Sequence, residues 1–263
     1  MPKFWGKWQA NEYICFIYNL NSFLMRTIKT WLATTAVLLC SITVSAHDFE
    51  DNGIYYNITS TADKTVEVTY KGNSYEAYSD EYYFHETIPS TVTNGDVTYK
   101  ITAIGESAFR GCKGVTGVTI PNTVSKIGDS AFGGCTKLSD LTLPSSLKTI
   151  GNCAFNYCEG LTAVTIPENI TIIGRDAFYG CITLSKVTYN ATACSTIGKE
   201  GSYYYGIFMN CSKLTTITIG SNVTRIPESA FSGCNKVTKI IIPEKITFIG
   251  KRALKKFSFF SQP

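Results

Sequence analysis

The chain has 263 residues and a formal net charge of +4, with 44% apolar and 17% charged residues. Four of the 24 basic residues and one of the 20 acidic residues come before residue 47, so the remainder carries 20 − 19 = +1. This near-neutral remainder, whose basic residues form no continuous face, excludes a nucleic-acid-binding surface.

Residues 25–46 are interpreted as a secretory signal peptide. Arg26 and Lys29 give a basic start, an apolar run follows from residue 31 to Val44, and small residues end the segment, which predicts cleavage after Ala46. The run is too short and too rich in Thr and Ser for a membrane span. The chain is therefore expected to be exported.

Residues 1–24 precede Met25, where such a signal properly begins. They are interpreted as an extension from a mis-called start codon, with a long basic leader region as the alternative.

Residues 47–102 predict a β-rich N-terminal cap with a first, widened repeat. Apolar residues alternate at 54–58 and 66–70, which predicts the two strands of a hairpin. An Asn94-Gly95 turn widens the repeat that follows. Five aromatic residues between these strands are interpreted as cap packing, or alternatively as an aromatic contact patch: Tyr75, Tyr78, Tyr82, Tyr83 and Phe84.

From residue 103 to residue 254 one motif returns at a fixed period. Six copies of Ala-Phe-x-x-Cys, or close variants, follow one another at 23 residues, except for one spacing of 30. Between them runs an L-x-x-L-x-L strand pattern, as in Leu138, Leu141 and Leu143, which places the last two side chains on one face. Periods of 20 to 29 residues are typical of leucine-rich solenoids, whose turns fold only when stacked.

Prolines and glycines punctuate each repeat. Proline, which lacks a backbone donor, follows the strands at Pro121, Pro144, Pro167 and Pro243. Glycine then turns the chain, and we expect a positive φ at its positions. These are Gly105, Gly128, Gly151, Gly174, Gly198 and Gly250.

The pattern L-x-x-L-x-L-P-x-x-L-x-x-I-G-x-x-A-F-x-x-C resembles the BspA-like class of leucine-rich repeats, over about residues 88 to 254. The resemblance implies a β-rich leucine-rich-repeat solenoid with a parallel sheet on its concave face and short strands and turns on its convex side. It also implies a secreted or cell-surface binding module, in some members an adhesin, and no enzyme activity.

Six of the ten cysteines recur at one repeat position: Cys112, Cys135, Cys158, Cys181, Cys211 and Cys234. Stacked at strand spacing and pointing inward together, they are expected to form a structural ladder of buried thiols rather than disulfides. Neither C-x-x-C nor H-x-x-x-H spacing occurs, so no metal site is predicted.

The outward strand positions are the first candidate binding surface. Threonine recurs at the second outward position, which fits either a plain solvated sheet face or a flat contact surface. The candidate contact residues there are Asp140, Thr142, Lys186, Thr188 and Lys239.

The 30-residue repeat carries an insertion with three adjacent tyrosines, Tyr203, Tyr204 and Tyr205. Insertions in solenoids form loops, often on a binding face, and tyrosine is enriched at binding hot spots. The alternative is a loop that folds back over the convex side.

Residues 255–263 form a basic and aromatic tail in which no cysteine completes the last repeat. The tail is interpreted as a truncated end, with a makeshift cap formed by its phenylalanines as the alternative. The two histidines, His47 and His85, belong to no catalytic motif, so no enzyme and no cofactor are predicted. The predicted function is non-enzymatic binding of an extracellular protein or glycan. The alternative is a spacer, or a fragment of a larger surface protein, without its own ligand.

Overall fold

The computed structural model describes residues 47–255, except residues 73–80, 201–202 and 205. The predicted signal peptide, its cleavage site at Ala46 and nearly all of the predicted tail lie outside the described residues, and the domain boundaries drawn from the sequence stay a prediction.

The N-terminal cap is a hairpin joined to the repeats. Strands β1 (Phe49–Asp51), β2 (Ile54–Ser60) and β3 (Thr65–Thr69) pair antiparallel in order. Strand β3 then lies parallel to β6 (Val97–Ile104), which forms a second hairpin with β5 (Thr91–Asn94). The predicted hairpin cap is confirmed, and its third strand covers the first edge of the repeat array.

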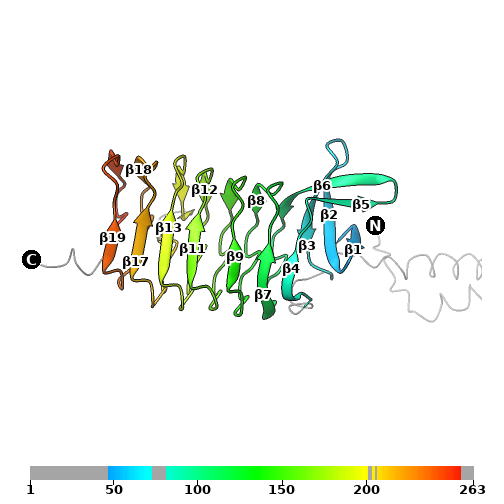
Figure 1. The fold of residues 1–263 in the computed structure, drawn as a ribbon, viewed down its shortest axis with the longest axis horizontal. Helices are drawn as coiled ribbons and strands as arrows, with labels where there is room; N and C mark the ends of the chain where they lie inside the picture. The colour runs from blue at the N-terminus through cyan, green and yellow to red at the C-terminus, as the bar shows by residue number, and fades with distance from the viewer. Residues whose placement is uncertain (1–46, 73–80, 201–202, 205, 256–263) are drawn as a thin grey trace, which may run out of the picture. The chain divides into compact units, whose positions relative to one another are not determined.

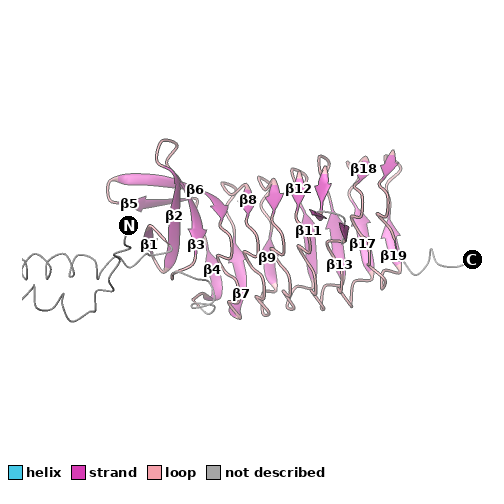
Figure 2. Cartoon of the chain, turned by 180° about the vertical axis from the view of Figure 1, so that it is seen from behind, coloured by secondary structure: helices cyan, strands magenta, loops and turns pink. Residues whose placement is uncertain are grey.

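The repeats stack so that each contributes one longer strand and one two-residue strand, and both kinds stack in parallel (Figure 1). The longer strands lie on one side, which we call the front sheet, and they pair in two parts. The first part is β4 (Tyr83–Thr87), β7 (Gly114–Thr119) and β9 (Asp140–Thr142), and the second is β11 (Ala163–Ile166), β13 (Lys186–Tyr189), β17 (Thr216–Ile219) and β19 (Lys239–Ile241). The short strands form the back sheet: β8 (Lys126–Ile127), β10 (Thr149–Ile150), β12 (Ile172–Ile173), β14 (Thr196–Ile197), β18 (Arg225–Ile226) and β20 (Phe248–Ile249). Figure 2 shows the same succession of strands from behind. The predicted strand-rich repeat solenoid is confirmed.

A column of aromatic rings runs through the core. Tyr82 of the cap lies 4.4 Å from Phe109, measured between ring centroids, and Phe109 lies 4.9 Å from Phe132. The phenylalanine rings of the next repeats continue the column at spacings of 5.0 to 6.1 Å, as far as Phe231. Each ring is fully buried, so one phenylalanine per repeat sets the stacking distance of the array.

The glycines of the Ile-Gly turns are required for a reason other than the predicted one. Of the six, only Gly198 has a positive φ, +54°, and the prediction was wrong for the other five. A Cβ on Gly128 would lie 2.8 Å from the carbonyl carbon of Gly105, and one on Gly151 would lie 2.5 Å from that of Gly128. The glycines are there because the backbones of successive repeats touch at this point.

The positive φ angles fall instead just before each Ala-Phe pair. Glycine is rare at this position, although φ there lies between +53° and +61°. The residues are Ser107, Ser130, Cys153, Asp176, Ser229 and Arg252. A non-glycine residue in this region costs about 1 kcal/mol, and the hydrogen bonds between neighbouring turns offset that cost.

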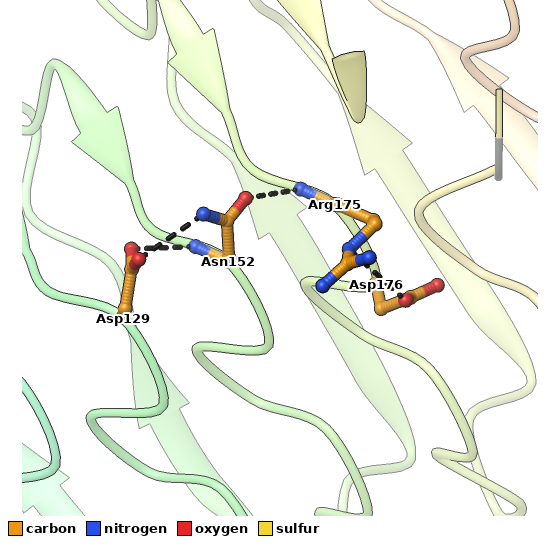
Figure 3. Close-up of polar contacts among 4 residues, drawn as sticks. All are labelled: Asp129, Asn152, Arg175 and Asp176. Atoms are coloured by element: carbon orange, nitrogen blue, oxygen red, sulfur yellow. Dashed lines mark hydrogen bonds and ion pairs between the residues drawn. The ribbon is translucent and has the colours of Figure 1, made fainter. Parts of the chain in front are cut away.

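Side chains beside the glycine column link three repeats through hydrogen bonds (Figure 3). The carboxylate of Asp129 accepts from the backbone N–H (2.8 Å) and from Nδ2 (3.1 Å) of Asn152. The Oδ1 atom of Asn152 in turn accepts from the backbone N–H of Arg175 (2.8 Å). Each side chain thus supplies an acceptor to the turn of the next repeat.

The back sheet is interrupted at the insertion. Strands β8 to β14 pair in sequence and β18 pairs with β20, but β14 and β18 belong to different sheets. At the junction, Pro227 occupies the place of the usual glycine. In the other repeats that glycine N–H donates to the preceding repeat, as Gly151 does to Ile127 O (2.9 Å). Proline has no N–H, so this bond cannot form at the junction.

Candidate binding face

Outward side chains of the front sheet form columns along the array. Thr119 pairs with Thr142, and Thr165, Thr188 and Thr218 pair in succession, with Ile241 next in line. We call the outward surface of strands β7 to β19 the threonine face. A parallel register that keeps identical residues side by side makes this surface repetitive and polar.

Charged residues occupy the neighbouring column of the same face. Asp140 pairs with Gly117, Lys186 with Ala163, and Lys239 with Thr216. Asp140, Lys186 and Lys239 are all exposed. The structure therefore brings the five predicted contact residues of the strands onto one surface, with the carboxylate towards its N-terminal end and the two lysines further along.

The N-terminal end of the threonine face holds a row of three side chains from three strands. His85 of β4 forms a hydrogen bond through Nε2 with Oγ1 of Thr119 on β7 (2.8 Å), and its Nδ1 lies 3.6 Å from Oδ2 of Asp140 on β9. The imidazole crosses β7 above Gly117, where a Cβ would collide with Nδ1. Glycine at this position is what allows His85 to reach the carboxylate.

A bulge in β4 directs this histidine outward. The register of β4 against β7 shifts between Phe84 and His85, and Phe84 has a φ of +62°. Bulges re-aim side chains, and a positive φ is rare for a bulky residue. Phe84 is also 78% exposed. The strand thus carries local backbone strain at the point where it presents an exposed ring and an imidazole.

Next to this row the surface is hollowed by about 490 Å³. The polar lining consists of His85, Thr119, Asp140 and Thr142, with Asn122 and Ser145 from the turns that follow the strands. Both the backbone N–H and the hydroxyl of Ser145 donate to Oδ1 of Asn122 at 3.2 Å. Buried or nearly buried apolar groups complete the lining: Val118, Ile120, Leu143 and Pro144.

The insertion lies elsewhere. Strands β15 (Lys199–Glu200) and β16 (Tyr203–Tyr204) pair antiparallel, and the hairpin directly follows β14 of the back sheet. Tyr205 lies outside the described residues. Tyr203 and Tyr204 therefore do not belong to the strands of the threonine face, and the contact role of the three tyrosines stays a prediction.

The six recurring cysteines are buried. Five of their thiols donate to the carbonyl of the phenylalanine in the preceding repeat, as Cys135 does to Phe109 (2.9 Å) and Cys158 to Phe132 (3.1 Å). Burial raises the pKa of the Cys135, Cys158 and Cys234 thiols. The pKa of Cys181 is raised first by a hydrogen bond with Cys211 and then by burial. The raised pKa values favour the neutral form of these four thiols, and the column faces the core.

Two kinds of site are missing from the part of the chain that the structure describes. No three His, Cys, Asp or Glu side chains there lie together as a metal-ion site. Within the same residues, no helix is long and apolar enough to cross a lipid bilayer.

A family model fits this architecture. Six copies of the BspA type leucine-rich repeat region match residues 80–205 and 201–261. The chain belongs to the BspA-type leucine-rich repeat family. The match begins at residue 80, so it includes β4 and its histidine as part of the first repeat of this BspA-type protein.

Solved structures of bacterial leucine-rich repeat proteins are similar to this chain. TpLRR of T. pallidum matches with a TM-score of 0.58 at 24% identity, over 76% of this chain and 85% of that one, and so shares the fold. A Bacteroides ovatus leucine-rich repeat protein matches at 24% identity and a TM-score of 0.43, over 80% of each chain. The pneumococcal vaccine antigen PcpA matches at 17% identity and a TM-score of 0.41, over 80% of this chain and 79% of that one. A comparison with curated proteins finds no significant match.

The sequence did not reveal the His85 row. Glu86 occupies the inward position of β4 that Val118 fills in β7, so β4 lacks the apolar pattern of the other front strands. The one available signal was Gly117, the single glycine in an outward position that the neighbouring strands fill with side chains.

Proposed function

We propose that this BspA-type protein is exported and binds an extracellular protein or glycan through its threonine face. The observation that supports this is the polar outward surface of β7 to β19, where threonines recur in register and Asp140 lies nearer the N-terminal end than Lys186 and Lys239. A rigid surface loses little conformational entropy on binding, which favours recognition without a cofactor. The mechanism is surface complementarity, and no reaction is required.

Export is the part of the proposal that can be tested first. All three tryptophans, Trp5, Trp8 and Trp31, precede the predicted cleavage site at Ala46. Protein recovered from the culture medium or cell surface should begin at His47 and show no tryptophan absorbance. An N-terminus that retains residues 1–46 would contradict export through this signal.

Binding is tested with the purified protein on a panel of extracellular-matrix proteins and glycans. Two variants divide the surfaces: Lys186→Ala with Lys239→Ala on the threonine face, and Tyr203, Tyr204 and Tyr205 changed to Ser in the insertion. We expect saturable binding that weakens about tenfold in the lysine variant, because exposed charges guide complementary partners. Binding lost only in the tyrosine variant would move the contact to the insertion. No saturable binding from a protein shown to be folded by circular dichroism would favour the spacer alternative.

A further inference from the structure

We infer that the hollow beside His85 and Asp140 is a binding subsite for a neutral saccharide. This inference rests on the proposed extracellular binding function and names the ligand class of one end of the threonine face.

The lining of the hollow selects the chemistry of its ligand. Three hydroxyls, an amide, a carboxylate and an imidazole converge on about 490 Å³, within the range of small-molecule pockets. Hydrogen bonds within the lining, from His85 to Thr119 and from Ser145 to Asn122, use only part of the capacity of these groups. An apolar ligand would displace water from the remaining donors and acceptors without replacing its hydrogen bonds, which costs binding free energy. A ligand with closely spaced hydroxyls satisfies both donors and acceptors.

Charge excludes the other polar ligands. The lining contains no Lys or Arg, and its one carboxylate, on Asp140, is 73% exposed, so phosphate, sulfate and nucleic acid would meet repulsion rather than pairing. One carboxylate and one imidazole are also too few ligands for a stable metal ion. Uncharged sugar hydroxyls remain the best match, since a carboxylate accepts strong hydrogen bonds from them.

The His85 row holds the carboxylate side of the subsite in place. Thr119 and Asp140 lie on either side of the imidazole, 2.8 and 3.6 Å from its two nitrogens. The order hydroxyl, imidazole, carboxylate is also that of a nucleophilic triad. However, β7 is paired on both edges, with β4 and β9, so its backbone N–H groups are engaged in the sheet and do not form an oxyanion hole beside Thr119. The row therefore orients Asp140 for binding.

The apolar groups of the site match the other face of a sugar ring. Leu143 and Pro144 lie in the lining itself. Phe84 and Tyr83, which directly precede His85 on β4, are not part of that lining but are exposed at 78% and 51%. Exposed rings of this kind stack on the C–H faces of saccharides. The strained bulge at Phe84 has no role in packing the core, which fits a backbone shaped for contact.

The test uses an array of immobilised neutral, sialylated and sulfated oligosaccharides, followed by titration with the free form of the strongest neutral binder. We expect binding of a neutral saccharide, weakened at least tenfold by Asp140→Ala. Gly117→Ala should weaken it similarly, because the added methyl would collide with Nδ1 of His85 and lie 3.0 Å from Cβ of Asp140, and so separates the two side chains. Phe84→Ala should weaken it by roughly threefold.

Asp96→Ala removes an exposed carboxylate in the turn between β5 and β6, away from the threonine face. It is the matched control and should leave saccharide affinity within about twofold of the parent. If no neutral saccharide binds the folded protein, or if Asp140→Ala leaves binding unchanged, the subsite is refuted. Preference for sialylated or sulfated ligands would refute it as well. If no saccharide binds but binding to a matrix protein is retained, the subsite is refuted and the proposed extracellular binding function stands.

Discussion

In this protein, the residue type that a position tolerates is often limited by contact with the equivalent position one repeat away. Gly151 illustrates this, because its φ is not positive and a Cβ there is barred by the preceding repeat, at 2.5 Å from the carbonyl carbon of Gly128 and 2.6 Å from the backbone N of Asp129. Gly134 has the opposite reason for being glycine. Its φ is +75°, and a Cβ there would find its nearest neighbour at 3.8 Å.

These two glycines give a matched pair of alanine variants. Gly134→Ala should lower the free energy of unfolding by about 1 kcal/mol through backbone strain alone. Gly151→Ala should cost on the order of 3 kcal/mol, since neither of the touching backbones can move without disturbing the sheet. Urea denaturation of both variants checks the order, and equal losses would contradict the steric explanation.

The same comparison shows what the sequence could not predict at this scale. Both glycines recur with the period, so the sequence indicated that they matter. A glycine can be required by a positive φ or by close contact with a neighbouring backbone. Which reason applies depends on the distance between two stacked repeats, and that distance cannot be read from the sequence of one repeat. The histidine row was missed for a related reason, because His85, Gly117 and Asp140 meet only through the register of three strands.

At the scale of elements, the thiol column couples stability to alkaline pH. The pKa values of Cys135, Cys158, Cys181 and Cys234 are raised above the ordinary 9.0 in the folded chain. Above pH 9 the unfolded chain loses these protons while the folded chain keeps them, so the free energy of unfolding falls as pH rises. Stability from this source is complete below pH 8.

We expect each thiol to remove about 1.4 kcal/mol between pH 8 and pH 10, or about 5 kcal/mol for the four together. Urea titrations at the two pH values measure the difference. Cys158→Ala should show a difference smaller by about 1.4 kcal/mol, because it carries one titrating thiol fewer. An unchanged difference in that variant would argue against ionisation of the column.

The strands were largely predictable from the sequence, those of the front sheet more than those of the back sheet. The L-x-x-L-x-L pattern marks the front strands from β7 onward, because their inward residues alternate at period two. The back strands have two residues each, too few for any periodicity, so only short strands and turns on the convex side were expected from the resemblance. The candidate contact residues of the front strands could be predicted for the same reason. Alternation along a strand identifies the residues that face the core and, between them, the residues that face outward.

At the scale of the whole array, the junction at Pro227 interrupts one of the two sheets but not the other. The front sheet continues across it through the pairing of β13 with β17, while the back sheet does not. Stability in stacked repeats is a sum of repeat and interface terms, so a half-bonded interface lets the repeats beyond it open separately.

Hydrogen exchange should reveal this division. The N–H of Gly151 donates to Ile127 O and that of Gly250 donates to Ile226 O, at nearly equal lengths of 2.9 and 2.8 Å. We expect exchange at Gly250 to be at least tenfold faster, because β18 and β20 form an isolated pair. Deleting residues 200–205 shortens the 30-residue repeat to 24 residues, and Pro227→Gly returns an N–H donor to the junction. The two changes together should narrow the difference in exchange rate, whereas equal exchange in the parent chain would contradict a weak junction.

Nearly every contact between turns joins residues that are one repeat apart in the sequence. This has a consequence for how the gene can change. Recombination that adds or removes one complete repeat leaves each remaining glycine, phenylalanine and cysteine beside an equivalent neighbour, so the coding sequence can change length without a change of fold. A partial duplication would set side chains against the glycine column and be lost by selection. At the junction beside Pro227 the back sheet is already interrupted, so an insertion or deletion that is not a whole repeat can be tolerated there.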